Sequence, residues 1–203
     1  MAGPARTDPE PGRPLRADAA RNRARVLEAA RAAFAESGLE VGVDEIARRA
    51  HVGKGTLYRR FPTKEALVRA IFDDVLDELE RAAGDAAGDP DPWQALVRFL
   101  RAAAAMQAAN QGFYDVVAQR LGPRALTVAH RDRMRGIVEG PLRRAQAAGA
   151  VRVDLRADDV PMLLRMVGAT TRPMLAGHPG GSWPRYLALL LDGIRPAAAT
   201  PLP

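Results

Sequence analysis

Apolar residues recur at helical spacing along almost the whole chain, and no stretch alternates as a half-buried strand does. Glycine and proline fall between most of the periodic stretches, where they end helices. From residue 18 the pattern predicts helices over about 18–37, 43–50, 54–61, 64–83, 92–109, 113–121, 124–148, 157–176 and 183–195. The sequence therefore predicts an all-α protein of about nine helices.

Several predicted helix ends carry residues that suit the free backbone groups there. Thr63 is placed to cap the helix that follows it, and Asp91 followed by Pro92 is a favourable helix start. Gly38 is placed to end the first helix in a left-handed conformation. These local signals support the helix boundaries that the apolar period predicts.

Three other stretches are expected to be irregular. Residues 1–17 are rich in proline, glycine and arginine without a helical period, so we expect a disordered basic arm. This arm is either a solvated tail or one whose arginines reach a DNA minor groove. The sequence GDAAGDPD at 84–91 predicts a loop, and Gly136 with Gly140-Pro141 predicts a kink in a later helix.

The segment 43–61 carries the pattern that says most about function. Its first short helix has apolar residues on one face, and a brief turn, His51-Val52-Gly53, follows. The second short helix has Leu57, Tyr58 and Phe61 on one side and the basic or hydroxyl-bearing residues Lys54, Thr56, Arg59 and Arg60 on the others. Two short helices joined in this way predict a helix-turn-helix unit whose polar side can enter a DNA major groove.

The charge distribution agrees with a polyanionic partner without establishing one. The net charge is +6, and thirteen basic against nine acidic groups in residues 1–66 account for +4 of it. The chain has only two lysines, Lys54 and Lys64, and both lie near the starts of successive helices in this region. A modest positive excess is typical of nucleic-acid-binding proteins but also of many proteins that bind none.

Other features exclude or disfavour several classes of protein. The chain has no cysteine, so it has no disulfide framework or thiolate metal site, which fits a cytoplasmic location. No apolar run is long enough to span a membrane, and the first residues lack the apolar stretch of a secretory signal. No metal site or cofactor is expected, because the histidines are scattered and no glycine-rich phosphate loop occurs.

Two functions of other classes compete with sequence-specific DNA recognition. An enzyme is disfavoured because no nucleophile or metal motif is present, and the acidic residues over 73–80 are typical of a solvated helix face. A purely architectural DNA-binding or protein-interaction module remains the other alternative. A cavity within residues 90–175 would argue against such a module, whereas a fully packed core would favour it.

The residues from about 22 to 71 resemble the TetR family of one-component bacterial transcription regulators. RARVLEAARAAFAESGLE at 23–40 is similar to the first helix of the family, and VDEIARRAHVGKGTLYRRFPTKEALV at 43–68 to the next three. Further along, RAQAAGAVRVDLRADDVPMLL at 144–164 is similar to the turn before the eighth helix in many members. The resemblance implies a helix-turn-helix domain over 18–66 and an effector-binding and dimerisation domain over 67–203.

The resemblance also implies roles for particular residues. The DNA contacts would come from the recognition helix and the start of the next helix, through Lys54, Gly55, Thr56, Tyr58, Arg59, Arg60 and Lys64. Gly55 would permit close backbone approach. The family pattern departs at Gly42 and Gly53, which lack a capping hydroxyl, and at His51, where members often have glycine. These departures put individual phosphate contacts in doubt and not the motif.

The resemblance assigns the larger domain to ligand binding and pairing. An effector cavity between the fourth and eighth helices is expected to involve Phe99, Met106, Phe113, Tyr114, Met134, Met162 and Met166, although apolar residues at helical spacing are core more often than ligand contacts. A homodimer interface on the last two helices is expected to involve Leu163, Val167, Leu187, Leu190 and Ile194, each facing either the partner or its own core. The implied protein is a repressor that a small molecule releases from a palindromic DNA operator.

Overall fold

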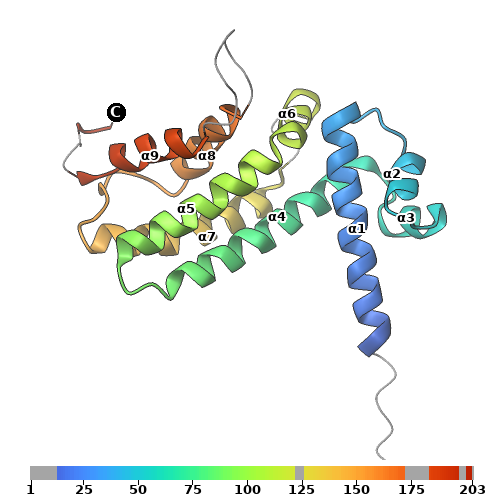
Figure 1. The fold of residues 1–203 in the computed structure, drawn as a ribbon, viewed down its shortest axis with the longest axis horizontal. Helices are drawn as coiled ribbons and strands as arrows, with labels where there is room; N and C mark the ends of the chain where they lie inside the picture. Colours follow the sequence, from blue (N-terminus) through green and yellow to red (C-terminus); the bar gives the residue numbers. More distant parts are fainter. Residues whose placement is uncertain (1–12, 122–125, 172–182, 197–199, 203) are drawn as a thin grey trace, which may run out of the picture.

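The computed structural model describes residues 13–121, 126–171, 183–196 and 200–202, and within them it contains nine α-helices and no strand (Figure 1). The helices are α1 (Arg13–Ser37), α2 (Val43–Arg49), α3 (Lys54–Arg60), α4 (Lys64–Ala87), α5 (Pro92–Ala109), α6 (Gln111–Arg120), α7 (Val128–Ala147), α8 (Asp159–Ala169) and α9 (Trp183–Gly193). The predicted all-α class is confirmed.

The predicted helix ends are present in the structure. The Thr63 hydroxyl accepts a hydrogen bond from the backbone N–H of Ala66 at 3.1 Å and so caps α4. The Asp91 carboxylate accepts from the backbone N–H of Trp93 at 2.8 Å at the start of α5. Gly38 ends α1 with φ of 74°, a left-handed conformation that glycine adopts without steric cost.

Three boundaries differ from the prediction by four or five residues, and one of them is the start of α7 at Val128 instead of about residue 124. α1 begins at Arg13 instead of about residue 18, because Pro14 is tolerated in a first turn, where the backbone N–H has no helical partner. α4 continues to Ala87, through half of the predicted loop, because Ala86 is buried in the core at 3 % exposure and this burial outweighs the cost of Gly84. The arm over residues 1–12 and the end of the predicted 157–176 helix lie outside the described residues.

Two clusters of buried side chains hold the helices together. One lies among α1, α2, α3 and the first turns of α4, and the other lies among the end of α4 and α5, α7, α8 and α9. Figure 1 shows α1–α3 at one end of the molecule and α8 and α9 toward the other, with α4 running between them. α4 therefore contributes to both cores, and it is the element that connects the two ends.

α6 belongs to the larger domain in sequence but packs on the smaller one. Its Phe113 is fully buried between Phe34 of α1 and Phe72 of α4, with ring centroids 6.3 and 5.6 Å away. Tyr114 lies beside Phe72 and Phe113 and extends this aromatic cluster. The packing thus crosses the division at residue 66 that the sequence predicts, and the two proposed domains share a core.

Candidate DNA-binding surface and internal cavity

The recognition helix α3 has one buried side and one exposed side. Leu57 and Phe61 are 2 % and 7 % exposed and anchor the helix in the core. The residues predicted to contact DNA lie on the exposed side: Lys54, Gly55, Thr56, Tyr58, Arg59 and Arg60. A hydrophobic anchor that fixes a polar outward face is the arrangement that a major-groove helix needs.

The turn between α2 and α3 has the backbone geometry that its sequence suggests. His51 has φ of 53°, and it is the only non-glycine residue with a positive φ among those described. Gly42 and Gly53 precede α2 and α3 in extended conformations and supply no side-chain cap. The predicted loss of a capping hydroxyl at both positions is confirmed, and the tight turn forms without it.

The two lysines already have partners in the free chain. The Lys54 ammonium lies 2.5 Å from a carboxylate oxygen of Asp44 on α2, and both side chains are more than half exposed. The Lys64 ammonium donates a hydrogen bond to the backbone carbonyl of Leu39 at 2.7 Å. Each ammonium has three N–H donors, so both lysines keep donors for another acceptor. Among the described residues, Arg59 and Arg60 form no ion pair.

Two further arginines on α2 are held by acidic neighbours. The Glu45 carboxylate accepts hydrogen bonds from Arg48 at 2.7 Å and from Arg49 at 2.8 Å, and Arg49 also donates to Glu36 at 2.6 Å. Hydrogen bonds from Arg48 and Arg49 lower the pKa of Glu45 to about 2. These carboxylates pair with both arginines of α2. The arginines of this surface without an ion pair to a described residue are therefore Arg59 and Arg60 on α3.

A cavity of about 550 Å³ lies among α4, α5, α6, α7 and α8, as the resemblance implies. Five of the seven predicted residues line it: Phe99, Met106, Tyr114, Met134 and Met162. Most other lining side chains are apolar, and those from α4 and α7 are Phe72, Val75, Leu76, Leu79, Ile137 and Val138. The polar lining residues of the interior are Gln107 and Tyr114.

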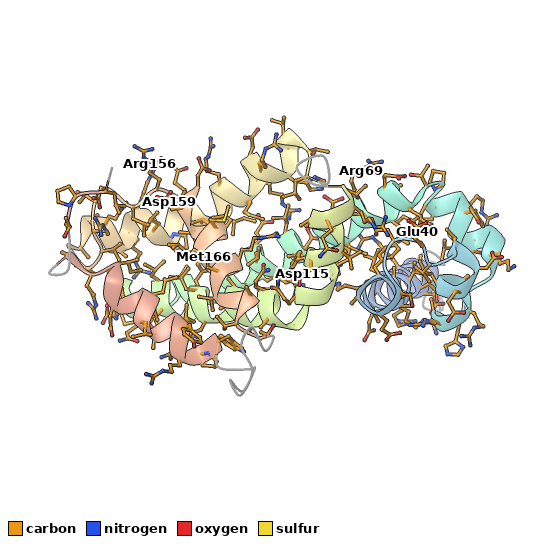
Figure 2. The ribbon with its side chains drawn as sticks, turned by 90° about the horizontal axis from the view of Figure 1, so that it is seen from above. Glu40, Arg69, Asp115, Arg156, Asp159 and Met166 are labelled. Atoms are coloured by element: carbon orange, nitrogen blue, oxygen red, sulfur yellow. The ribbon has the colours of Figure 1, made fainter. Side chains whose placement is uncertain are left out.

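Two predicted cavity residues lie elsewhere. Phe113 points into the aromatic cluster beneath α1, because α6 turns this face toward the smaller core. Met166 on α8 is 62 % exposed and does not line the cavity (Figure 2). Helical spacing identifies the apolar side of a helix but does not say which neighbour covers it, so the sequence could not separate these residues from the other five.

Two polar contacts that the sequence does not predict join α1 to the larger domain. Arg31 of α1 donates hydrogen bonds to Asp74 of α4 at 2.9 Å and to Asn110 at 3.3 Å, between α5 and α6. Burial raises the pKa of Tyr114, which lines the cavity, to about 12, and the charge of Arg31 opposes this shift. The two hydrogen-bonded pairs are 43 and 79 residues apart, and no local motif marks such long-range pairs.

His130 has a structural part rather than a catalytic one. Its Nδ1 accepts a hydrogen bond from the backbone N–H of Thr127 at 3.2 Å, while the Thr127 hydroxyl caps α7. Nε2 lies 3.0 Å from Asp73 of α4, so the ring also ties α7 to α4. No group of three or more histidine and acidic side chains in the described parts of the chain is placed to hold a metal ion.

Comparisons with known proteins agree with this geometry. Residues 26–71 match the family described as bacterial regulatory proteins of the tetR family, and residues 91–196 match the C-terminal domain of SbtR-like transcriptional regulators. The chain is 32% identical to the TetR transcriptional regulator SCO0520 from Streptomyces coelicolor, with a TM-score of 0.65 over 87% of this chain and 99% of that one. The chain belongs to the TetR family.

Two other proteins extend the comparison. A TetR regulatory protein from Mycobacterium vanbaalenii is 37% identical, with a TM-score of 0.63 over 89% of this chain and 99% of that one. The uncharacterized regulator YhgD from Bacillus subtilis is 40% identical over 62 residues, 30% of this chain and 32% of that protein. The chain therefore spans about a third of the curated relatives it matches. Membership places it among DNA-binding transcription regulators and not among enzymes.

The last two helices of this TetR-family chain only partly follow the predicted dimer surface. Val167, Leu187 and Ile194 are 4, 2 and 6 % exposed and pack in the chain's own core, which is one of the two alternatives left open for these residues. Leu163 and Leu190 are half-buried beside the same core. The exposed apolar side chains here are Met162, Met166 and Leu189. No helix in the described residues is long and apolar enough to cross a membrane.

Proposed function

We propose that the protein represses transcription by binding a palindromic DNA operator as a homodimer and leaves that operator when a small molecule fills its cavity. The single observation that carries this proposal is the exposed side of α3, with Lys54, Thr56, Tyr58, Arg59 and Arg60 above a buried Leu57. Arginine and lysine contact guanine edges and phosphates, and a threonine methyl group contacts thymine. Lys64 adds a donor near the start of α4.

A dimer follows from the limited reach of one helix-turn-helix unit. Two recognition helices about 34–36 Å apart can read successive major grooves on one face of DNA, which requires two-fold symmetry. The exposed Met166 and Leu189 on α8 and α9 are apolar groups that a second copy could cover. We therefore place the dimer surface on the outer sides of these helices and not on the buried positions.

The cavity favours a ligand-responsive regulator over an architectural module. A space of about 550 Å³ in the middle of the larger domain is of the size that holds a small molecule. α4 lines this space with Phe72, Val75 and Leu76 and also carries Lys64 at its first residue. A ligand that binds more tightly to one tilt of α4 would shift the population of that tilt and change operator affinity in proportion.

Operator binding by designed variants tests the DNA-binding surface. We expect Lys54→Ala and Tyr58→Ala to abolish the mobility shift of DNA from the protein's own upstream region, because each removes a donor from the exposed side of α3. Gly55→Ala is the sharpest variant, since a Cβ there meets no other atom within 4 Å. The fold should therefore tolerate alanine, and a loss of affinity would report close approach of DNA to the backbone.

Arg101→Ala is a matched control, because it removes one exposed positive charge from α5, away from α3. Its operator affinity should stay close to that of the unchanged protein at moderate salt. The logarithm of affinity should fall with the logarithm of salt concentration by roughly 0.9 per phosphate neutralised. Unchanged affinity of the Lys54 and Tyr58 variants, or a flat salt response, would refute the assignment of this surface.

A further inference from the structure

The cavity has an uneven electrostatic lining. Two charged side chains, Asp158 and Arg165, lie among the residues that line it. Asp158 accepts two hydrogen bonds from Arg135, at 2.8 and 2.7 Å, so its charge is compensated. Arg165 forms no ion pair with any of the described residues. The cavity therefore has one uncompensated charge among its described lining residues, and that charge is positive.

Arg165 lies where the end of a bound molecule would reach it. It is an exposed residue of α8, one helical turn after Pro161 and Met162, which also line the cavity. Apart from Gln107, the lining residues of α4, α5 and α7 are apolar, with Leu76, Phe99 and Ile137 among them. A molecule that places its apolar part against these walls can therefore direct a charged end to the open edge at α8.

The uncharged polar groups do not compensate Arg165. The Gln107 amide donates to Gln111 at 3.2 Å, which leaves its carbonyl as an acceptor. The Tyr114 hydroxyl has no hydrogen bond to a described residue, and burial keeps it protonated by raising its pKa to about 12. Both groups can bind neutral polar atoms of a ligand. Neither supplies the carboxylate that a cationic ligand would need, and Asp158 is already engaged by Arg135.

We infer that the cavity binds an amphipathic organic anion, with its apolar body against α4, α5 and α7 and its acidic group at the Arg165 guanidinium. A planar guanidinium suits a carboxylate, sulfonate or phosphate group because it donates two parallel hydrogen bonds. The inference rests on the proposed function in one respect, that this cavity is the effector site. It adds the chemical class of the effector.

Two fluorescent dyes with a shared ring system test this inference without DNA. 1-Anilinonaphthalene-8-sulfonate carries a sulfonate, and N-phenyl-1-naphthylamine has the same rings without it. We expect the unchanged protein to prefer the sulfonate by about tenfold, the effect of one charge-assisted contact. Arg165→Gln should weaken sulfonate binding about tenfold and leave binding of the neutral dye unchanged. Fluorescence titration gives all four affinities.

Arg156→Gln is the matched control, because it removes the same net charge near the start of α8 from a residue that does not line the cavity (Figure 2). Its dye affinities should equal those of the unchanged protein. Ala118→Phe adds bulk from a lining residue into the cavity and should weaken both dyes, with circular dichroism confirming the fold. This variant distinguishes the cavity from other exposed apolar surface, to which such dyes also bind.

Equal affinity for the two dyes, or sulfonate binding that survives Arg165→Gln, would overturn the inference. Dye binding that Ala118→Phe does not weaken in a folded protein would overturn its location. Operator binding is measured separately. A protein that fails to bind operator but selects the sulfonate through Arg165 would refute the proposed function and leave the ligand class standing.

Discussion

The Lys54 ammonium pairs with the Asp44 carboxylate in the free chain. A contact between Lys54 and DNA would therefore replace this ion pair. Both side chains are largely exposed, at 66 and 57 %. An ion pair in such a position contributes only about 0–1 kcal/mol, so a phosphate or base edge can displace the carboxylate at little cost. The pair holds the ammonium near the start of α3. Asp44 therefore orients Lys54 without removing it from the DNA-binding surface.

The exposure of the α3 residues was predictable, but their partners were not. The helical period places Leu57 and Phe61 inside, which leaves Lys54, Thr56 and Arg59 outside. The pairing of Lys64 with the Leu39 carbonyl depends on how the loop after α1 approaches α4. The apolar period does not contain this information, because it reports only which side of a helix is buried.

The lowered pKa of Glu45 predicts that the free energy of unfolding depends on pH. Its hydrogen bonds with Arg48 and Arg49 lower its pKa in the folded chain to about 2, below the value in an unfolded chain. The stabilisation is therefore fully present above the unfolded pKa and is lost as the pH falls through the folded pKa. We expect Glu45→Gln to melt at a lower temperature than the unchanged protein at pH 6, with the gap closing toward pH 2.

Thermal unfolding followed by circular dichroism between these pH values measures this gap. Glu28→Gln is the control, because Glu28 is an exposed residue of α1 with no ion pair among the described residues. A gap that stays constant down to pH 2 for Glu45→Gln would show that the carboxylate charge does not provide the stabilisation.

At the scale of elements, local signals predicted where most helices begin and end. Asp91 with Pro92 begins α5 as expected, and Thr63 caps α4, because capping depends on residues that are adjacent in sequence. The end of α4 was not predictable in this way. Its last turn depends on the burial of Ala86 in the core that α5, α7, α8 and α9 form, and Gly84 gives the opposite local signal.

The sequence likewise does not predict that α6 packs on α1. The contribution of this packing to stability can be measured. Phe113 is fully buried between Phe34 and Phe72. We expect Phe113→Ala to lower the free energy of unfolding by about 3–5 kcal/mol, because truncation leaves a cavity shared by α1, α4 and α6. Urea unfolding followed by circular dichroism measures the change.

Val153→Ala is the comparison for this variant, since Val153 is 85 % exposed and its truncation should change stability by less than about 0.5 kcal/mol. If both variants had similar stability, Phe113 would not anchor α6 to the core that α1 and the first turns of α4 share. α6 would then have to be regarded as part of the larger domain alone.

At the scale of the whole molecule, α8 and α9 each carry apolar residues in the chain's own core and apolar residues on the surface. Leu187 and Leu191 are buried in the chain's own core, whereas Met166 and Leu189 are 62 and 57 % exposed. The sequence shows both sets as apolar residues on short helices. Only the packing of α8 and α9 against α5 identifies which set remains for a second copy of the chain.

We expect Leu189→Glu to convert the proposed dimer to a monomer, because it places a charge in a surface that the partner would cover. Sedimentation velocity measures the mass, and operator affinity should fall with it, since one recognition unit alone remains. Val128→Glu, on a residue of α7 that is 63 % exposed, should leave the mass unchanged. A Leu189→Glu protein that keeps the mass of the unchanged protein would place the interface elsewhere.

The length of α4 has a consequence for regulation. Its 24 residues extend about 36 Å at ~1.5 Å per residue, from Lys64 at the DNA-binding end past the cavity. A rotation of the whole helix by only ~5° about its far end would carry its first turn sideways by roughly 3 Å, close to the ~3.4 Å step between stacked bases. If the proposed function holds, a ligand that moved the part of α4 beside the cavity by less than the width of a methyl group would therefore shift the start of α4 by about one base step.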